Sequence, residues 1–256
     1  MKKVATTVEV LENKLITSNF YLLSLQYEGT EPEPGQFVNL SVEPFFLKRP
    51  FAVFDFDKKN KVLKLLYKKV GKGTETMSVW EKGLKAEILC PLGNGFDLAS
   101  EDSVMIAGGT GIASVYYLSR KLKGKRKIFI GLTDKNEAEA FQTLFQESGA
   151  EFIISTLKGD YGFHGNVIDC AVETLKGQKD YTVYACGPEG MFLSLDQKIN
   201  EQKLLPGKTF VSMEGRMGCG FGVCLGCAVE KKGSDQFFYV CKDGPVFHIN
   251  EINWKA

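Results

Sequence analysis

Short runs of apolar or alternating residues recur along the first part of the chain, up to about residue 97. Clusters that contain Pro and Gly separate these runs, for example residues 31–35 and 91–95. Many short strands with such spacing are typical of a β-barrel or β-sandwich. One helix is expected over 74–82, with Thr74 as its N-cap and Gly83 just beyond its end. The expected strands span residues 7–11, 20–26, 36–40, 51–54, 62–67 and 86–90.

The pattern changes after residue 95, where apolar runs of strand length begin to alternate with stretches of helix length. Such alternation predicts a doubly wound parallel sheet with helices packed on it. From about residue 210 the chain is rich in Gly and Cys and shows no helical pattern. The expected strands are 103–107, 127–132, 151–156 and 182–186, and the expected helices are 112–122, 137–147, 166–175 and 188–202.

These patterns predict a chain of α/β plus β class in three parts. Residues 1–98 form an antiparallel β-barrel, residues 99–209 a doubly wound parallel-sheet domain, and residues 210–256 a small cysteine-rich subdomain. A chain of 256 residues is long enough to bury such cores without disulfides or metals as staples.

Composition excludes several classes of protein. Hydrophobic residues make up 44% of the chain and charged residues 25%, as in soluble globular proteins. The net charge of +1 gives no overall attraction to nucleic acid or to an anionic membrane. No apolar leader follows Met1, and the longest uncharged stretch, 103–119, is too broken by Gly and Ser to span a membrane. We therefore expect a cytoplasmic protein with neither nucleic acid nor membrane as a partner.

Four of the seven cysteines crowd the last forty residues in the pattern C-x4-C-x2-C…C, at Cys219, Cys224, Cys227 and Cys241. This is the ligand spacing of plant-type [2Fe–2S] clusters. Glycines within 218–226 let such a loop fold closely and turn backbone N–H groups toward the sulfur atoms. A structural zinc site is the alternative, but zinc sites more often show two C-x2-C pairs. Disulfides are disfavoured in the cytoplasm. The spacing therefore favours a [2Fe–2S] cluster held by these four thiolates.

Two loops between an expected strand and an expected helix have the composition of nucleotide-binding loops. One is 108–111, with the sequence Gly-Gly-Thr-Gly, and the other is 186–190, with Cys-Gly-Pro-Glu-Gly. Both fall at the carboxyl ends of parallel strands, where open α/β sheets bind ligands. The first loop lacks the G-x-G-x-x-G fingerprint, so by itself it fits a nucleotide site and close packing of strand and helix equally well.

Two features of the barrel region could bind a phosphate group. Arg49 stands at the start of an expected strand, where its guanidinium can hold a phosphate with two hydrogen bonds. Residues 71–74 precede a helix and can bind an anion at its N-terminus. The simpler interpretations are an ordinary strand edge and a turn with a helix cap. The seven lysines between residues 58 and 72 are most simply a solvated hairpin.

The order of these motifs resembles the ferredoxin–NADP reductase superfamily: Arg-Pro-Phe-Ala at 49–52, Gly-Lys-Gly-Thr at 71–74, Gly-Gly-Thr-Gly-Ile at 108–112 and Cys-Gly-Pro at 186–188. The C-terminal motif over 216–247 narrows the resemblance to the electron-transfer subunits of dihydroorotate dehydrogenase B. The resemblance covers the whole chain and is most specific in its tail. It implies that the barrel binds FAD, the parallel-sheet domain binds NAD, and the last part binds a [2Fe–2S] cluster.

The resemblance also implies which barrel residues meet FAD. Arg49 would hold an FAD phosphate, and the strand that follows it would run beside the flavin. The superfamily commonly has Ser or Thr where Ala52 stands, so a side-chain hydroxyl for flavin N5 is missing here. The expected FAD-binding residues are Arg49, Pro50, Phe51, Ala52, Leu66, Tyr67, Lys68, Gly73 and Thr74.

The nucleotide contacts follow from the same resemblance. The glycine loop would approach the pyrophosphate, and the Cys-Gly-Pro loop the nicotinamide. Asp134, in the loop after the second strand, can accept a hydrogen bond from a ribose 2′-hydroxyl and would repel a 2′-phosphate, which favours NAD over NADP. The expected NAD-binding residues are Gly108, Gly109, Thr110, Gly111, Asp134, Cys186, Gly187 and Pro188.

The implied function is electron transfer in pyrimidine (UMP) biosynthesis. An FMN-containing catalytic subunit would oxidise dihydroorotate, and electrons would pass through the [2Fe–2S] cluster and FAD to NAD⁺, in a heterotetramer of two plus two chains. No catalytic acid, base or nucleophile is expected, because the flavin carries the chemistry. The alternatives are the electron-transfer subunit of a related NAD(P)H-dependent ferredoxin or sulfide oxidoreductase, and a flavin-bearing redox regulator.

Overall fold

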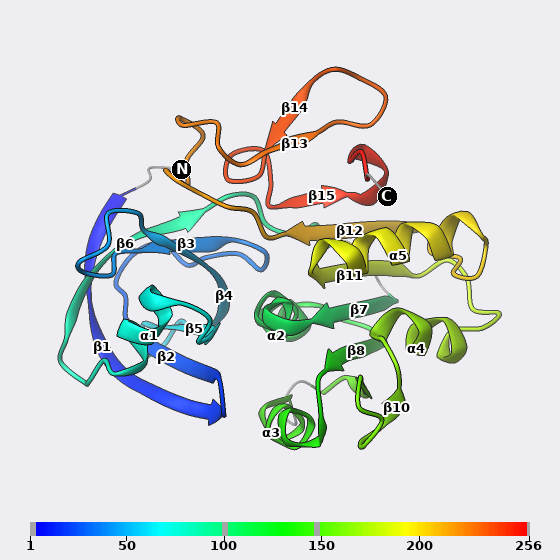
Figure 1. Cartoon of the computed structure of the whole chain (residues 1–256), viewed down its shortest axis with the longest axis horizontal. Coiled ribbons are helices and arrows are strands. Elements are labelled where there is room, and N and C mark those ends of the chain that lie inside the picture. Colours follow the sequence, from blue (N-terminus) through cyan, green and yellow to red (C-terminus); the bar gives the residue numbers. More distant parts are fainter. Residues whose placement is uncertain (1–3, 99–101, 146–148, 255–256) are drawn as a thin grey trace.

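The computed structural model describes residues 4–98, 102–145 and 149–254. A β-barrel and an α/β body stand side by side, and the last part of the chain runs along the junction between them (Figure 1). Met1 and the expected helix end at Glu147 lie outside the described residues. Within those residues, no helix has the length and apolar character needed to span a membrane.

The barrel is closed by six antiparallel strands in the order β1-β2-β5-β4-β3-β6, which confirms the prediction. Alternate side chains such as Val10, Leu23, Leu65 and Ile88 fill its interior. Strand β1 is longer than expected because its first half pairs with β6 and its second half with β2. The bounds are β1 Val4–Thr17, β2 Phe20–Gln26, β3 Phe37–Leu40, β4 Arg49–Asp57, β5 Val62–Lys68 and β6 Lys85–Leu92.

The helix of the barrel region, α1 (Lys72–Ser78), begins and ends earlier than expected. Thr74 lies inside its first turn rather than at the N-cap, where Gly71 stands. The Thr74 hydroxyl oxygen accepts hydrogen bonds from the N–H groups of Val70 (2.9 Å) and Gly71 (3.1 Å). Gly83 occupies a later turn with φ +92°. The prediction of Thr74 as N-cap and Gly83 as stop was therefore wrong, because Thr74 reaches back to its neighbours from within the helix.

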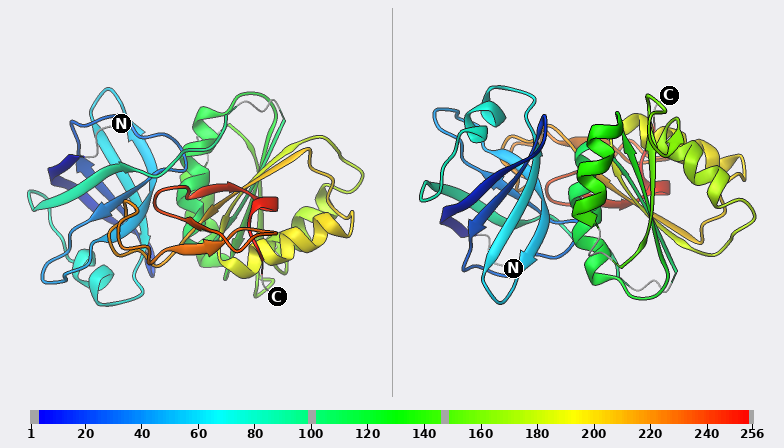
Figure 2. Two further views of the ribbon diagram at one scale, coloured as in Figure 1. Left: turned by 90° about the horizontal axis from the view of Figure 1, so that it is seen from above. Right: turned by 90° about the horizontal axis from the view of Figure 1, so that it is seen from below.

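The second body is a seven-stranded sheet in the order β10-β9-β8-β7-β11-β12-β15, parallel except for β15, with helices on both faces (Figure 2). Helices α2 (Ile112–Lys121) and α3 (Lys135–Phe145) share one core, and α4 (Val167–Thr174) and α5 (Glu189–Asn200) share the other. This confirms the doubly wound prediction. The strands are β7 Ser103–Gly108, β8 Arg126–Leu132, β9 Glu151–Thr156, β10 Phe163–His164, β11 Thr182–Gly187, β12 Lys208–Met213 and β15 Val246–His248.

The sequence pattern missed β12 and β15. β12 pairs with β11 in parallel, and β15 pairs with β12 in antiparallel orientation. The boundary expected between residues 209 and 210 falls inside β12, so the last part of the chain begins within the parallel sheet. That part also holds a hairpin of β13 (Ala228–Glu230) and β14 (Phe237–Tyr239), and its Val240 and Phe247 are buried in the core of α4 and α5.

Helix α2 fixes the barrel to the sheet. The rings of Phe54 on β4 and Tyr116 on α2 stack with centroids 4.1 Å apart. Arg120 forms an ion pair of 2.6 Å with Asp55, whose side chain is only 3% exposed. The Tyr117 hydroxyl donates to the carbonyl oxygen of Pro32 (2.8 Å). These contacts hold the two bodies in one arrangement and so fix the space between them.

We expect Arg120→Ala to lower the free energy of unfolding by about 2–3 kcal/mol, because it leaves the buried Asp55 carboxylate with only Lys64, 3.9 Å away, among the described cations. Lys121→Ala is the matched control on the same helix: its pair with Glu31 is more exposed, and its loss costs less than about 1 kcal/mol. Chemical denaturation of the full chain measures both. Equal losses for the two variants would contradict the importance of the Asp55 pair.

Candidate functional site

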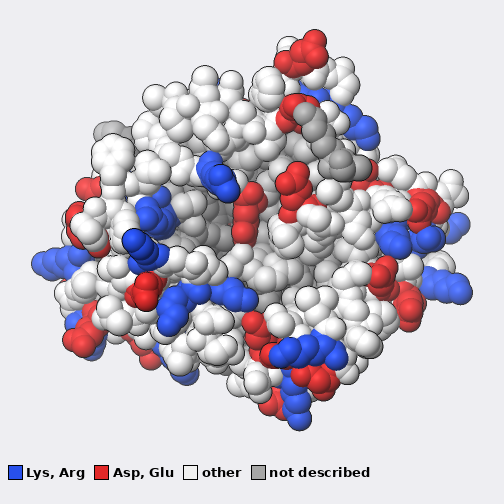
Figure 3. Space-filling model, in the orientation of Figure 1, with Lys and Arg blue, Asp and Glu red and all other residues white. Residues whose placement is uncertain are grey.

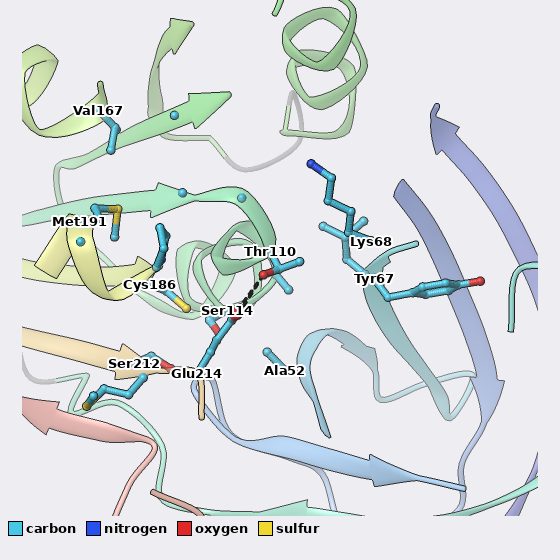
Figure 4. Close-up of a pocket in the computed structure, with 18 of the residues that line it drawn as sticks. Ala52, Tyr67, Lys68, Thr110, Ser114, Val167, Cys186, Met191, Ser212 and Glu214 are labelled. Atoms are coloured by element: carbon cyan, nitrogen blue, oxygen red, sulfur yellow. Dashed lines mark hydrogen bonds between the residues drawn. The ribbon is translucent and has the colours of Figure 1, made fainter. Parts of the chain in front are cut away.

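A cavity of about 820 Å³ lies between the barrel and the carboxyl ends of the parallel strands. It opens on the face of the molecule in Figure 3, where charged side chains surround a central hollow. This volume is in the range of sites for cofactors and other small molecules. Its walls come from both bodies, with β4, β5 and α1 on one side and the loops after β7, β8, β11 and β12 on the other (Figure 4).

Seven of the nine residues expected to bind FAD line this cavity: Pro50, Phe51, Ala52, Leu66, Tyr67, Lys68 and Thr74. The other two, Arg49 and Gly73, lie against each other. A Cβ atom at Gly73 would come within 2.6 Å of Arg49 Nε, so only glycine lets the guanidinium approach the start of α1. The Arg49 guanidinium also stands over the Phe45 ring, 4.8 Å from its centroid. The structure thus brings an arginine and a helix start together, as a phosphate group requires.

Five of the eight residues expected to bind NAD line the opposite wall: Gly108, Gly109, Thr110, Cys186 and Pro188. Gly111 and Gly187 serve packing instead. A side chain at Gly111 would overlap the Cys186 carbonyl group, and one at Gly187 would come within 2.7 Å of Met191. Close packing of strand and helix therefore accounts for Gly111, whereas Gly108 and Gly109 face the cavity, where a nucleotide site stays a prediction.

Asp134 is not among the residues that line the cavity. Its Oδ2 pairs with Lys158 Nζ at 2.8 Å, and its Oδ1 accepts a hydrogen bond from the Glu137 N–H (3.3 Å) at the start of α3. The carboxylate that does line the cavity here is Glu137. It accepts a hydrogen bond from the Thr133 N–H (2.9 Å) and lies 3.5 Å from Lys68 Nζ on the barrel side.

Sequence reasoning missed Glu137 and Glu214. Glu214 follows β12, and its carboxylate accepts hydrogen bonds from the Thr110 hydroxyl at 2.9 and 3.1 Å (Figure 4). It is open to the cavity yet surrounded by protein on most sides, and this burial raises the pKa of its carboxyl above the usual value. Burial likewise raises the pKa of the adjacent Cys186 thiol to about 12. Glu214 directly follows β12, and a residue at the carboxyl end of a parallel strand is a candidate site residue. The hydrophobic pattern did not predict β12, so Glu214 was not recognised.

The four expected cluster ligands come together in the last part of the chain. The Sγ atoms of Cys227 and Cys241 are 3.3 Å apart. Cys219 and Cys224 lie on the adjacent loop, where the N–H of Cys224 donates to Cys219 Sγ (3.4 Å) and the N–H of Cys219 to Cys224 Sγ (3.5 Å). The thiols therefore form two neighbouring pairs, which matches two iron atoms with two thiolates each.

The chemistry of this loop fits a cluster. Partial burial acts to raise the pKa of the Cys219 thiol, but backbone N–H donors, that of Cys224 foremost, outweigh it and lower the pKa to about 6. Thiolate is the form that binds metal. Burial and the neighbouring Cys227 raise the pKa of the Cys241 thiol to about 12. A bound metal cation would stabilise the thiolate and so offset this rise. Among the described residues, no three His, Cys, Asp or Glu side chains surround a single-ion position.

The cysteine loop is anchored on the barrel through Asn39 of β3. The Asn39 side chain is fully buried, and its Nδ2 donates a hydrogen bond to the carbonyl oxygen of Cys219 (3.2 Å). Gly220 has φ +78°, and a Cβ atom there would overlap Asn39 Nδ2. Glycine at 220 is therefore required twice, by its backbone conformation and by the close approach of the barrel.

We expect Cys224→Ser to remove the [2Fe–2S] cluster, so that iron content and the electron paramagnetic resonance signal of the reduced cluster fall to background, while bound FAD remains. Cys170→Ser is the matched control, because Cys170 is buried on α4, outside the cysteine loop. Anaerobic purification, iron analysis and the resonance spectrum test both variants. An unchanged spectrum of Cys224→Ser would overturn its assignment as a ligand.

Comparison with known proteins agrees with this site. The family described as the iron–sulfur cluster binding domain of dihydroorotate dehydrogenase B matches residues 214–253. The electron transfer subunit of dihydroorotate dehydrogenase B (NAD(+)) from Caldanaerobacter subterraneus subsp. tengcongensis is 37% identical over 95% of this chain and 96% of its own length. That from Enterococcus faecalis is 35% identical over 98% of this chain and 99% of its own.

Solved structures show the same fold. An NADH-dependent reduced ferredoxin–NADP oxidoreductase has a TM-score of 0.84 with 23% identity, over 99% of this chain and 92% of that one. A ferredoxin NADP⁺ reductase from Neisseria gonorrhoeae, solved with bound FAD and NADP, has a TM-score of 0.66 with 16% identity, over 78% of this chain and 92% of that one. With relatives at 35–37% identity over nearly the whole chain, the protein belongs to the family of electron transfer subunits of dihydroorotate dehydrogenase B.

Proposed function

We propose that this chain receives electrons from an FMN-containing catalytic subunit that oxidises dihydroorotate, and delivers them by way of a [2Fe–2S] cluster and FAD to NAD⁺ in pyrimidine (UMP) biosynthesis. One observation carries the proposal. Asn39 donates to the carbonyl oxygen of Cys219, and its neighbour in the β3–β4 pair is Pro50, which lines the cavity. The cysteine loop and the expected flavin wall are therefore separated by one pair of strands.

The residues of the barrel side fit FAD. Arg49 and the first turn of α1 would hold its phosphates, and Phe51 and Leu66 would provide an apolar wall for the ring system. Tyr67 also borders the cavity, but its ring points into the barrel core, where it stacks on Tyr21 (centroids 5.3 Å apart) (Figure 4). FAD, once bound, supplies the conversion between single electrons and a hydride. Ala52 offers no hydroxyl group to it, so any hydrogen bond at that place comes from elsewhere in the cavity.

The residues of the α/β side fit NAD. The backbone of Gly108–Thr110 leaves room for a pyrophosphate, and Cys186 and Pro188 would bound the nicotinamide. Lys68 extends into the cavity from the barrel (Figure 4), where its ammonium group faces Glu137 and supplies positive charge for the bound cofactors. We assign no acid–base step to any of these residues, because hydride transfer needs position and water exclusion rather than a protein acid.

The cysteine loop itself presents an apolar face to solvent, made of the exposed side chains of Phe221, Val223 and Leu225. Their exposed fractions are 42%, 71% and 51%. Large apolar side chains gathered on a surface mark a site of protein association. We propose that the catalytic subunit covers this face, which brings its flavin close to the cysteines, and that the complex contains two copies of each chain. We also propose that the complex works in the cytoplasm, where seven cysteines without disulfides are ordinary.

A second candidate is an electron-transfer subunit of a related NAD(P)H-dependent ferredoxin or sulfide oxidoreductase. The observation that favours it is the close match in fold, over 99% of the chain, to a reduced ferredoxin–NADP oxidoreductase. Anaerobic mixing of this chain with the FMN-containing dehydrogenase separates the two candidates.

We expect dihydroorotate-dependent NAD⁺ reduction only when this chain, with FAD and cluster, is mixed anaerobically with the FMN-containing dehydrogenase from the same source. NADH formation is followed by its absorbance, with each chain alone as the control. If a preparation that oxidises NADH with a dye gives no activity with the dehydrogenase but reduces ferredoxin or oxidises sulfide compounds, the second candidate replaces the first.

We expect Val223→Asp to weaken binding of the catalytic subunit roughly tenfold or more, because it puts a charge into an apolar interface. NADH oxidation with a dye stays unchanged, since the Val223 side chain points to solvent. Val79→Asp is the matched control: Val79 is 75% exposed but lies at the end of α1, away from the cysteine loop. Titration of the two chains by calorimetry measures the affinity. Equal effects of the two variants would contradict the assignment of this face.

A further inference from the structure

An ion pair stands at the carboxyl ends of β8 and β9, beside the cavity on the α/β side. Asp134 Oδ2 and Lys158 Nζ are 2.8 Å apart. The residue before each, Thr133 and Leu157, lines the cavity. The two loops are tied together by their backbones, because the Lys158 N–H donates to the carbonyl oxygen of Thr133 (3.2 Å). The pair therefore borders the cavity at the ends of β8 and β9, the two strands next to β7, which the glycine loop follows.

The two partners differ in how firmly they are held. Asp134 is fixed by α3, because its Oδ1 accepts from the Glu137 N–H and its carbonyl oxygen accepts from the Ala138 N–H (3.1 Å). Its side chain is 21% exposed. The Lys158 side chain is 60% exposed and is held in the described structure by Asp134. Removal of the carboxylate charge would thus free a long cationic side chain at the edge of the cavity.

The chemistry of the two dinucleotides gives this pair a role. NAD presents a neutral 2′-hydroxyl at its adenosine ribose, whereas NADP presents a dianionic phosphate. In doubly wound sheets an acidic side chain after the second strand accepts from the 2′-hydroxyl, and a cationic side chain accommodates the 2′-phosphate. In this chain both groups stand at one corner, each next to a residue that lines the cavity, but the acid neutralises the base. Each carboxylate oxygen keeps a lone pair for a hydroxyl group while it is bonded to Lys158 or to the backbone.

We propose that the Asp134–Lys158 pair decides between the two dinucleotides: Asp134 accepts the ribose 2′-hydroxyl of NAD and at the same time occupies Lys158, which would otherwise bind the 2′-phosphate of NADP. This rests on the proposed function, in which the dinucleotide binds in the cavity between the barrel and the sheet. Lys158 is thus a specificity-determining residue that is masked by its partner.

The surrounding charges support this assignment. The hydrogen bond from Lys158, followed by that from the Glu137 N–H, lowers the pKa of the Asp134 carboxyl, so it is ionised at neutral pH. The other cation of the loop, Lys135, pairs with Glu139 at 3.5 Å, one turn along α3. That pair carries the same two charges, but neither residue lines the cavity. It therefore provides a matched control for a general change in the charge of this loop.

Asp134→Asn tests the proposal, because asparagine keeps the acceptor for the Glu137 N–H and removes only the charge. We expect kcat/KM for NADPH, measured with a dye as acceptor on the chain loaded with FAD and cluster, to rise about tenfold, the gain of one charge-assisted hydrogen bond. We expect the double variant Asp134→Asn, Lys158→Ala to lose that gain. Glu139→Gln should leave the preference between NADH and NADPH unchanged.

A binding measurement without electron transfer accompanies these rates. Calorimetric titration with adenosine 2′,5′-bisphosphate, against adenosine 5′-phosphate, reports the 2′-phosphate contact alone. We expect Asp134→Asn to tighten the bisphosphate about tenfold and to leave the monophosphate within twofold. The proposal is overturned if Asp134→Asn raises neither kcat/KM for NADPH nor the affinity for the bisphosphate, or if Glu139→Gln raises them as much. The proposed function is not affected by that result as long as the chain still oxidises NADH. If neither dinucleotide is oxidised and neither adenosine phosphate binds the unmodified chain, the proposed function itself fails.

Discussion

The site depends on the packing of helix α2, which lies between barrel strand β4 and the parallel sheet. The stack of Phe54 on Tyr116 and the ion pair of Asp55 with Arg120 tie this one helix to the barrel. The start of the same helix follows the glycine loop that lines the cavity. A change in the spacing of barrel and sheet would expose apolar surface and leave the buried Asp55 carboxylate without its partner. The cavity between the two bodies therefore keeps a defined width.

The cysteine loop is joined to both bodies as well. Asn39 holds Cys219 from the barrel, while Cys227 and Cys241 are buried against the core of the sheet. Asn94, in the loop that leaves the barrel, donates through its backbone N–H to the carbonyl oxygen of Gly244 (2.7 Å), shortly after the last ligand. An electron carrier gains from such attachment, because the rate of transfer depends on a fixed distance between sites. The last part of the chain therefore connects the two bodies and is not an appended module.

The polar groups around the cavity are paired across elements. Lys68 of the barrel faces Glu137 of α3, and Thr110 of the glycine loop donates to Glu214 after β12. Each pair joins residues from segments far apart in the chain, so the charges are placed by the closed structure and not by any local motif. A cavity that balances its charges in this way suits the binding of phosphorylated cofactors, for which position and local potential matter more than a protein acid or base.

The sequence by itself determined the features that depend on near neighbours. Alternation of apolar residues revealed the barrel and the wound sheet, and the spacing of the cysteines indicated their cluster, because alternation is visible within one segment and three of the four cysteines stand close together at 219, 224 and 227. Only the tertiary structure decided that Gly111 serves packing, that β12 extends the sheet and that Glu137 and Glu214 line the cavity. These features depend on contacts between segments that are far apart in the chain. The hydrophobic pattern of one segment does not show which other segment will pack against it.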